Sequence, residues 1–234
     1  MKGLFNASVA AWRRFVGFGF RLLYNELAWT YDLVSWVVSR GQWREWQKSA
    51  LPYLPQKGRV LEVGTGPGHL QAELAATGHQ PVGLDLSRSM LRLARRRMGR
   101  GGFPAWLCRG HVGALPFARG AFEAIVATFP TNYIYDPASL MEFVRVLEPG
   151  GQLAVVEMAS ISGRDPLSHS LEWLYRITGQ RGPAPDLVDL LTKAGMSARR
   201  EAVRIDGSSV SLVLAERAEQ GPSGSDSPTS GQLG

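Results

Sequence analysis

A glycine-rich loop, set between a short apolar run and a helical pattern, most constrains how this chain can fold. Residues 59–63 (RVLEV) have the branched composition of a buried β-strand, and glycines follow at positions 64, 66 and 68. Residues 69–76 then have the spacing of a helix. Because glycine has no Cβ, such a loop turns sharply and approaches a ligand closely, and the next helix offers free N–H groups. The sequence therefore predicts a ligand-binding strand–loop–helix unit.

Strand and helix signals continue to alternate beyond this loop. A helix is predicted after Ser87, a second one from Pro137 and a third over residues 185–194. The dipeptide Asp206-Gly207 separates two further strands and is a strong signal for a β-hairpin. The pattern predicts an α/β fold, a Rossmann-like doubly wound sheet that is mostly parallel with an antiparallel C-terminal hairpin strand. The predicted strands cover residues 59–63, 81–85, 105–109, 122–128, 152–158, 198–205 and 209–216.

The chain divides into a central domain with extensions at both ends. Residues 1–50 are aromatic and amphipathic, which predicts an N-terminal helical cap on a domain spanning residues 51–218. Residues 159–185 interrupt the alternation and are interpreted as an insert that covers the substrate. Residues 219–234 are rich in Gly, Ser, Pro and Gln, which predicts a disordered tail. No apolar run approaches the ~20 residues that a membrane-spanning helix needs.

Composition excludes several classes of site. The single cysteine, Cys108, rules out an internal disulfide framework and a cysteine-based zinc cluster, so no metal site is expected. Its apolar neighbours predict a buried structural thiol, and a cytoplasmic location fits. The net charge of +6 comes mostly from arginine, and four arginines gather at positions 95–100. No nucleic-acid motif accompanies them, so they are interpreted as a solvated helix end.

The spacing around the glycine loop indicates the kind of ligand. Asp85 ends the next predicted strand, where a carboxylate can accept hydrogen bonds from both hydroxyls of a ribose. The dinucleotide fingerprint would need glycine where this chain has His69 or Gln71, and no Lys-Ser or Lys-Thr pair follows the loop. A pyrophosphate is therefore disfavoured. Glu62 suits a phosphate-free ligand with a positive amino group, because a carboxylate can pair with it.

These segments resemble the class I S-adenosylmethionine-dependent methyltransferases. Residues 62–68 (EVGTGPG) look like the first motif of the family, and Asp85 within VGLDLS looks like its acidic loop. Residues 110–117 (GHVGALPF) look like the adenine-side segment, and residues 145–151 (RVLEPGG) look like the motif before the fifth strand. The order and spacing are those of the family, and the nearest subgroup contains the ubiquinone and menaquinone C-methyltransferases.

The resemblance implies S-adenosylmethionine as the cofactor and assigns its contacts. The loop glycines would line the methionine and ribose portion, Glu62 would lie near the amino group, and Leu86 and Met90 would flank the adenine. Where the family usually has an Asp that bonds the adenine amino group, this chain has His111-Val112. A neutral imidazole accepts one hydrogen bond but supplies no charge. The implied cofactor-binding residues are Glu62, Gly64, Thr65, Gly66, Gly68, Asp85, Leu86, Met90, His111, Val112 and Thr128.

The acceptor and any catalytic base are less constrained. Methyl transfer is an in-line displacement that depends mainly on alignment, and a base is required only where the nucleophile must lose a proton. Candidates near the expected mouth are Tyr24, Tyr31, Asp32, Tyr133 and His169. Aromatic residues in the N-terminal cap favour a small hydrophobic acceptor such as a quinone precursor or a lipid, with peripheral membrane contact through the N-terminal segment. The oligomeric state is left open.

Two other classes of function remain as alternatives. An RNA or protein methyltransferase would use the arginines at positions 95–100, although no nucleic-acid partner is favoured. A non-catalytic Rossmann-like binding domain is left open by His111, whereas the intact Glu62 and Asp85 count against it.

Overall fold

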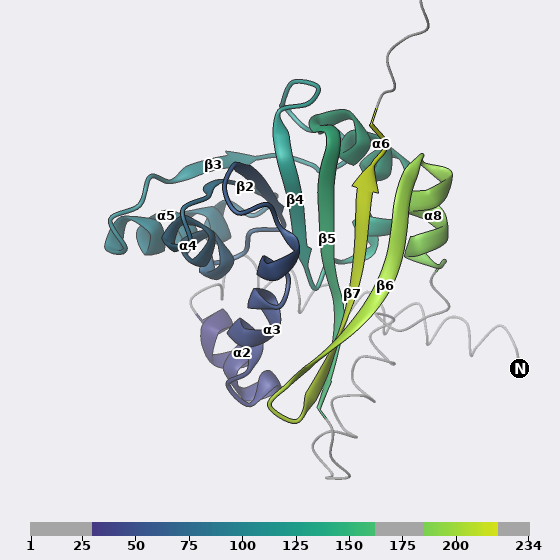
Figure 1. Ribbon diagram of the computed structural model, residues 1–234. Helices are drawn as coiled ribbons and strands as arrows, with labels where there is room; N and C mark the ends of the chain where they lie inside the picture. Colours follow the sequence, from purple (N-terminus) through teal and green to yellow (C-terminus); the bar gives the residue numbers. More distant parts are fainter. Residues whose placement is uncertain (1–29, 162–184, 220–234) are drawn as a thin grey trace, which may run out of the picture.

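The computed structural model describes residues 30–161 and 185–219. Their strands form one seven-stranded sheet in the order β3-β2-β1-β4-β5-β7-β6 (Figure 1). The first five strands are parallel, whereas β7 is antiparallel to both β5 and β6. The strands are β1 (Arg59–Val63), β2 (Gln80–Asp85), β3 (Trp106–Arg109), β4 (Phe122–Thr128), β5 (Leu147–Ile161), β6 (Met196–Ile205) and β7 (Ser208–Arg217).

Helices cover both faces of this sheet, which confirms the predicted doubly wound architecture. The helix α4 begins and ends where the sequence predicted it, and the turn at Asp206 and Gly207 joins β6 to β7 as expected. The helices are α2 (Tyr31–Ser39), α3 (Trp43–Lys48), α4 (His69–Ala76), α5 (Arg88–Arg100), α6 (Pro137–Val146) and α8 (Leu187–Lys193), with short 3-10 helices η2 (Leu51–Tyr53) and η3 (Asn132–Tyr135).

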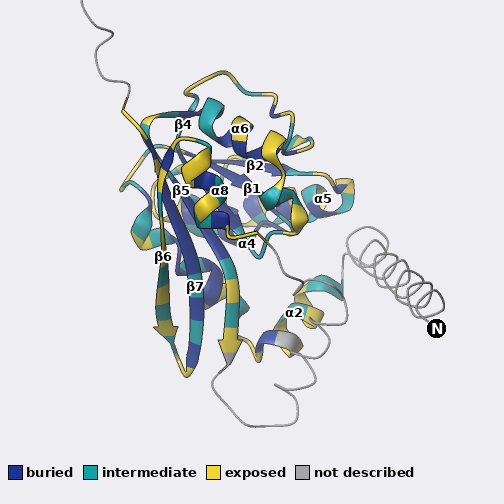
Figure 2. Ribbon diagram, turned by 90° about the vertical axis from the view of Figure 1, so that its right-hand side faces the viewer, coloured by how far each residue is buried: buried dark blue, intermediate teal, exposed yellow. Residues whose placement is uncertain are grey.

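The core consists of two apolar layers, one on each face of the sheet. On one face, Phe143 of α6 and Leu191 of α8 pack on the sheet and are completely buried. On the other face, Trp46 of α3 and Leu74 of α4 pack against residues such as Val126 of β4. Figure 2 shows the resulting pattern, with buried strands between partly exposed helices. Each large side chain buried in this way stabilises the fold by roughly 1.5–3 kcal/mol.

The helices α2 and α3 belong to the predicted N-terminal cap, and α3 docks at the β6–β7 turn. The indole Nε1 of Trp46 donates a hydrogen bond to Ser208 Oγ at 2.8 Å, and Gln42 Nε2 donates to the backbone oxygen of Asp206 at 2.9 Å. That turn lies at the end of the sheet where the parallel strands finish (Figure 1). The cap is therefore held beside the carboxyl ends of the strands.

Two predictions need correction, and others lie outside the described residues. Cys108 is half-buried, because β3 is the edge strand of the sheet and lacks a neighbour on one side. The strand predicted over residues 152–158 extends over Leu147–Ile161, because Leu147 pairs with Phe122 of β4 and β7 pairs with β5 as far as Ile161. Four predictions fall outside the described residues: Tyr24, His169, most of the insert at 159–185 and the tail after Glu219. Within the described part, no helix is long and apolar enough to cross a bilayer.

Candidate cofactor-binding site

The loop between β1 and α4 has the backbone that its glycines permit. Gly64, Gly66 and Gly68 have φ values of +73°, +54° and +80°, in the left-handed region that other residues rarely adopt. The N–H of Gly64 donates to Leu84 O at 2.8 Å, which ties the loop to the end of β2. A Cβ on Gly68 would lie 2.7 Å from the Cβ of Ala94, so α5 packs directly against the loop. The conformation and the packing therefore both require glycine there.

The carboxylate of Asp85 connects the loop to the second strand. Its Oδ2 accepts the backbone N–H of Gly66 at 2.8 Å, and its Oδ1 accepts that of Ser87 at 2.7 Å. Ser87 in turn caps α5, since its Oγ accepts the N–H of Met90 at 3.2 Å. Burial raises the pKa of Asp85, while the backbone hydrogen bonds oppose that shift. A carboxylate is thus fixed at the carboxyl end of β2, where the sequence predicts a ribose contact.

Glu62 is a buried acid with one unsatisfied oxygen. Its side chain is 1% exposed, and its Oε2 accepts the Nε2 of Gln71 at 2.8 Å. Its Oε1 has no hydrogen-bond partner among the residues that the structure describes. Burial raises the pKa of Glu62 to about 8, so the carboxyl group is largely protonated at neutral pH. A cationic group nearby would favour the charged form and lower that pKa.

Tyr133 lies over the start of the glycine loop. Its hydroxyl donates to Val63 O at 3.3 Å, and a Cβ on Gly64 would lie 2.9 Å from the same hydroxyl oxygen. Tyr133 belongs to η3, which follows β4, so two neighbouring strands bring the phenol and the loop together. The sequence placed Tyr133 among its catalytic candidates, and the structure brings it to the predicted cofactor loop.

Aromatic side chains lie beyond the end of β4. Thr128, the last residue of β4, accepts a hydrogen bond from Gln47 Nε2 at 3.1 Å. Phe129 follows with φ of +49°, which is uncommon for a bulky residue and typical of strained functional sites. Its ring stacks on Trp43 with the centroids 4.3 Å apart, and Tyr31 meets Trp43 edge-on at 6.4 Å. The cap therefore forms an aromatic wall beside the loop.

The predicted adenine contacts differ in how much surface they offer. Leu86 is 60% exposed at the end of β2, whereas Met90 is completely buried inside α5. The side chain of Val112 is also buried, and His111 Nδ1 accepts the N–H of Gly113 at 3.1 Å. Thr65 is buried too, and its hydroxyl donates to the backbone oxygen of Glu62 in β1 at 3.2 Å. Among these residues, Leu86 presents the largest apolar surface to a ligand.

An ionic contact that the sequence did not predict joins the cap to the loop. Asp32 of α2 lies 2.8 Å from His69 Nε2 and 2.6 Å from an Arg97 nitrogen. Arg97 also donates to Pro67 O within the loop. The hydrogen bond from His69, followed by the charges of His69 and Arg97, lowers the pKa of Asp32 to about 2. No local spacing could reveal this contact, because its members come from three separate helices.

The residues at this edge of the sheet fit S-adenosylmethionine, which joins a nucleoside to a cationic amino acid. The nearest atom to a Cβ built on Gly66 is 4.0 Å away, so the backbone there is open to close approach. Asp85 offers a fixed carboxylate, Leu86 offers apolar surface, and Glu62 has an unsatisfied oxygen beneath the loop. Within the described residues, no cluster of His, Cys, Asp or Glu could hold a metal ion.

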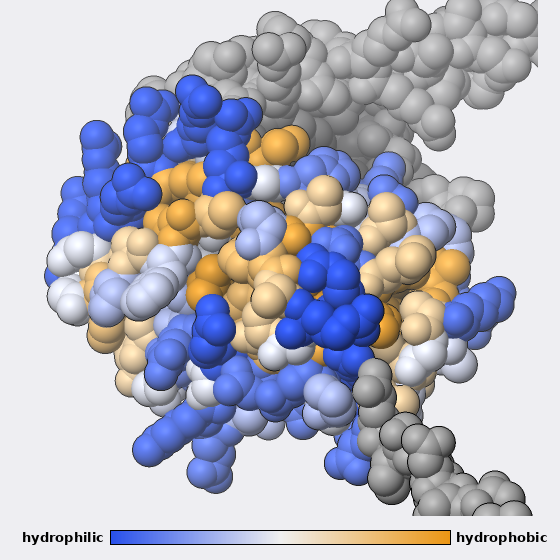
Figure 3. Space-filling model, turned by 90° about the horizontal axis from the view of Figure 1, so that it is seen from above, coloured by the Kyte–Doolittle hydropathy of each residue, from blue (hydrophilic) through white to orange (hydrophobic). Residues whose placement is uncertain are grey.

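A small cavity of about 170 Å³ lies elsewhere. Pro52, Gln152, Arg199 and Glu216 are among its lining residues, which places it at the amino end of β5. Figure 3 shows this opposite end of the molecule, where hydrophilic side chains project around smaller apolar areas. None of the predicted site residues lines the cavity, so it is separate from the candidate site.

Comparisons with known proteins agree with this geometry. A family model described as a methyltransferase domain matches residues 60–151. A demethylmenaquinone methyltransferase from Thermus thermophilus is 33% identical over 164 residues, which cover 68% of this chain and 72% of that protein. A demethylmenaquinone methyltransferase from Renibacterium salmoninarum is 35% identical over 141 residues, and the chain spans only 57% of its length.

Solved structures show the same fold at low sequence identity. A SAM-dependent methyltransferase from Methanosarcina mazei superposes with a TM-score of 0.54 at 21% identity, covering 74% of this chain and 98% of that one. The phosphoethanolamine N-methyltransferase 2 of Haemonchus contortus, in complex with S-adenosylhomocysteine, gives a TM-score of 0.58 at 17% identity, covering 76% and 53%.

Proposed function

This chain belongs to the S-adenosylmethionine-dependent methyltransferase family that includes the demethylmenaquinone methyltransferases, and we propose that its acceptor is a small hydrophobic ring of the quinone type. The observation that carries this proposal is the aromatic wall beside the glycine loop. Trp43 stacks on Phe129 immediately after β4, and Tyr31 packs against Trp43. A flat, apolar acceptor gains most from such rings, because they offer a large contact area with little conformational freedom.

The cofactor contacts follow from the geometry of the loop. Asp85 is proposed to bind the ribose, the backbone at Gly64 and Gly66 to approach the methionine portion, and Leu86 to pack on the adenine. Glu62 is proposed to compensate the positive amino group from beneath the loop. S-adenosylmethionine supplies a methyl group already activated on a sulfonium, so these residues act by binding and alignment.

Tyr133 is proposed to orient the reacting end of the cofactor. Its hydroxyl lies at Gly64, where the methionine portion would pass the loop. Tyr133 also packs against the apolar core beside the loop, which restricts the movement of its ring. Tyr133 thus has a positioning role, and proton transfer belongs to another group.

Two buried polar atoms of α3 support binding of a ring that carries oxygens. Trp43 Nε1 and Gln47 Oε1 are buried and have no hydrogen-bond partner within the described ranges. The two side chains lie on the same face of α3, because they are four residues apart. A buried unsatisfied group costs roughly 1–3 kcal/mol, so a ligand that bonds both atoms gains affinity. The pair offers one donor and one acceptor, which suits hydroxyl or carbonyl oxygens on the acceptor.

Peripheral membrane contact is proposed for the exposed side of α2. Leu33, Val34, Trp36 and Val37 are between 39% and 63% exposed there, a concentration of apolar surface on one short helix. Asp32, on the same helix, pairs with Arg97, which also donates to Pro67 O in the glycine loop. Such an arrangement would bring the site to a lipid surface, where hydrophobic quinone-type molecules partition.

Transfer of the methyl group tests the proposal. The protein is incubated without oxygen with methyl-labelled S-adenosylmethionine and either 1,4-dihydroxynaphthalene or 2-hydroxy-1,4-naphthoquinone, and with total tRNA as a control. The proposal expects label on a ring carbon of at least one naphthalene compound and none on tRNA. Label on tRNA alone, or on neither ring, contradicts it.

A further inference from the structure

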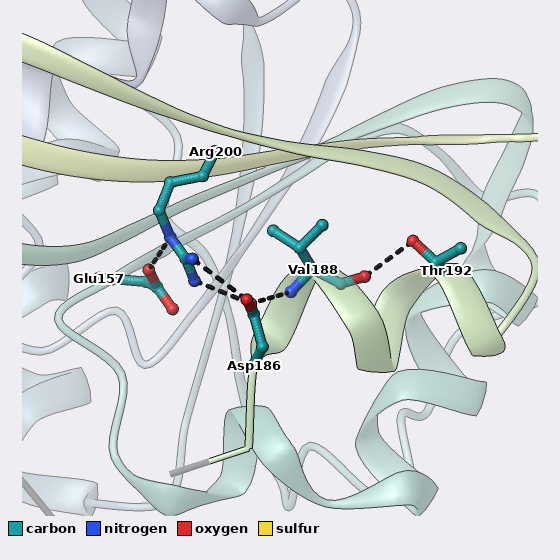
Figure 4. A network of polar contacts seen from close by, with 5 residues as sticks. All are labelled: Glu157, Asp186, Val188, Thr192 and Arg200. Carbon is teal, nitrogen blue, oxygen red and sulfur yellow. Dashed lines mark hydrogen bonds and ion pairs between the residues drawn. The ribbon is translucent and has the colours of Figure 1, made fainter. Parts of the chain in front are cut away.

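A second polar network lies near the carboxyl end of β5, away from the residues proposed to bind the cofactor. Arg200 of β6 reaches Glu157 of β5, with Nε 3.2 Å from Oε2, and its guanidinium lies 3.0 Å from Asp186 Oδ1 (Figure 4). Asp186 caps α8 by accepting the N–H of Val188 at 2.9 Å. Two carboxylates therefore fix the guanidinium. The other oxygen of Glu157, Oε1, has no hydrogen bond to any residue in the described part of the chain.

The network lies at the same edge of the sheet as the cofactor loop. Val63 of β1 pairs with Ala127 of β4, and Ala127 pairs with Val155 of β5. Glu157 lies two residues further along, and neighbouring strands are about 4.8 Å apart, so its Cα is on the order of 10 Å from the loop. An acceptor ring and a methyl group together span a distance of this order.

Glu157 also occupies an irregular position in its strand. Val156 pairs with Leu212 and Met158 with Ser211, so Glu157 is the extra residue of a β-bulge. Bulges redirect a side chain and are over-represented beside active sites. The side chain of Glu157 is 14% exposed, compared with 43% for Arg200. The carboxylate of Glu157 is thus mostly removed from water but remains accessible to a ligand.

The 3-10 helix η3 links this network to the loop. Near the start of η3, the hydroxyl of Tyr133 donates to Val63 O. At its end, Tyr135 interacts electrostatically with Glu157 and Arg200. Burial, and then the negative charge of Glu157, raise the pKa of Tyr135, so its hydroxyl remains a donor. One phenol of η3 therefore lies at the glycine loop, and the other lies close enough to Glu157 to feel its charge.

We propose that Glu157 is the acceptor-side base and that Arg200, held by Asp186, is the residue that positions it. This inference rests on the proposed function, since it requires an acceptor ring with a hydroxyl group. Glu157 Oε1 accepts the hydroxyl proton of the ring, which places the electron pair on the ring and makes the neighbouring carbon nucleophilic. That carbon bonds the methyl carbon while the carbon–sulfur bond breaks and its electron pair leaves on sulfur. The ring then loses its C–H proton to solvent and the oxygen regains a proton from Glu157.

The first test compares binding of two probes to the wild type and to Glu157→Gln, without cofactor, by quenching of tryptophan fluorescence. The hydroxyl groups of 1,4-dihydroxynaphthalene are protonated at neutral pH, whereas 2-hydroxy-1,4-naphthoquinone is an anion. Loss of a hydrogen bond to a charged group should weaken binding of the first probe about tenfold. Binding of the anion should stay the same or become tighter, because a repulsive charge is removed. A general loss of structure would weaken both probes, and Glu216→Gln, at an exposed acid on β7, should weaken neither.

The second test measures transfer to the same probes. With 1,4-dihydroxynaphthalene, Glu157→Gln should lower kcat by about 100-fold, the usual size of a base contribution, and lower it far less with the ionised probe. Arg200→Met should act in the same direction, Arg200→Lys should recover part of the loss, and Arg199→Met should have little effect. Arg199 is 63% exposed and pairs with Glu201 instead.

The outcomes separate this inference from the proposed function. If the wild type methylates the probes while Glu157→Gln loses nothing, or loses equally on both, the role of Glu157 is wrong and the proposed function stands. If the wild type methylates neither probe, the acceptor class is wrong and the inference falls with it.

Discussion

The carboxylate of Asp85 accepts the backbone N–H of Gly66 at 2.8 Å, so the end of β2 holds the glycine loop that follows β1. Replacement by Asn keeps the volume but removes the charge and one of the acceptor oxygens. We expect Asp85→Asn to weaken binding of S-adenosylmethionine at least tenfold in calorimetric titration, since hydrogen bonds to a charged group are worth about 1.5–3 kcal/mol. The variant Asp189→Asn, at an exposed acid of α8, should bind like the wild type.

Gly68 should not tolerate a side chain. A Cβ there would lie 2.7 Å from Ala94, and φ is +80°. We expect Gly68→Ala to lower the free energy of unfolding in urea by roughly 2–4 kcal/mol, the sum of backbone strain and overpacking. Gly78→Ala is the matched control, because Gly78 has φ of +88° and its Cβ would meet nothing within 4 Å. If the two variants lose the same stability, the contact between the loop and α5 is not tight.

Glu62 should make stability depend on pH. Its pKa is raised from 4.5 to about 8 in the folded protein, so the folded state holds a proton that the unfolded state has released between these pH values. The contribution to stability is complete below pH 4.5 and is lost as the pH rises toward 8. We expect the unfolding free energy of the wild type to fall over that range by up to about 1.4 kcal/mol per pH unit, and Glu62→Gln to flatten the profile. Equal slopes in both proteins would show that Glu62 is not the responsible group.

Asp32 should restrain the N-terminal cap rather than stabilise the whole fold. The side chain is 49% exposed, and ion pairs of this kind contribute about 0.2–1 kcal/mol. We expect Asp32→Asn to change the unfolding free energy by less than 1 kcal/mol but to speed dissociation of S-adenosylmethionine severalfold in stopped-flow measurements. Raising the salt concentration should speed dissociation from the wild type and have little effect on the variant. A variant that releases the cofactor at the rate of the wild type would contradict the restraint.

Much of this molecule follows from local sequence, and the remainder depends on long-range packing. The loop at 64–68, the helix after it and Asp85 at the end of β2 were all predictable, because glycine spacing and strand composition are local signals. The half-buried state of Cys108 was not, since nothing local shows that β3 is an edge strand. Met90 is completely buried within α5, and its contact with the adenine stays a prediction.

The contacts that couple separate elements were also beyond prediction. Asp32 meets His69 and Arg97 only after α2 folds back onto the loop. Glu157 appeared in the sequence as an ordinary polar residue within an apolar strand. Its role depends on a bulge opposite β7 and on Arg200, which is 43 residues away.

The exposed side of α2 gives a direct test of membrane contact. We expect the wild type to sediment with vesicles of phosphatidylglycerol and phosphatidylcholine at low salt, and Trp36→Ser to bind them at least severalfold more weakly, because interfacial tryptophan anchors such helices. Trp106→Ser is the matched control, since Trp36 and Trp106 are 61% and 63% exposed but only Trp36 lies on α2. Equal loss in both variants, or no sedimentation of the wild type, would contradict a docking role for α2.

The most direct test of the account is calorimetric titration of the protein with S-adenosylmethionine, with NADH as the comparison ligand. The glycine spacing, the carboxylate of Asp85 and the exposed Leu86 predict one molecule of S-adenosylmethionine bound per chain and no binding of NADH. Binding of NADH, or the absence of binding by either ligand to the folded protein, would contradict the assignment of this edge of the sheet as a methyl-donor site.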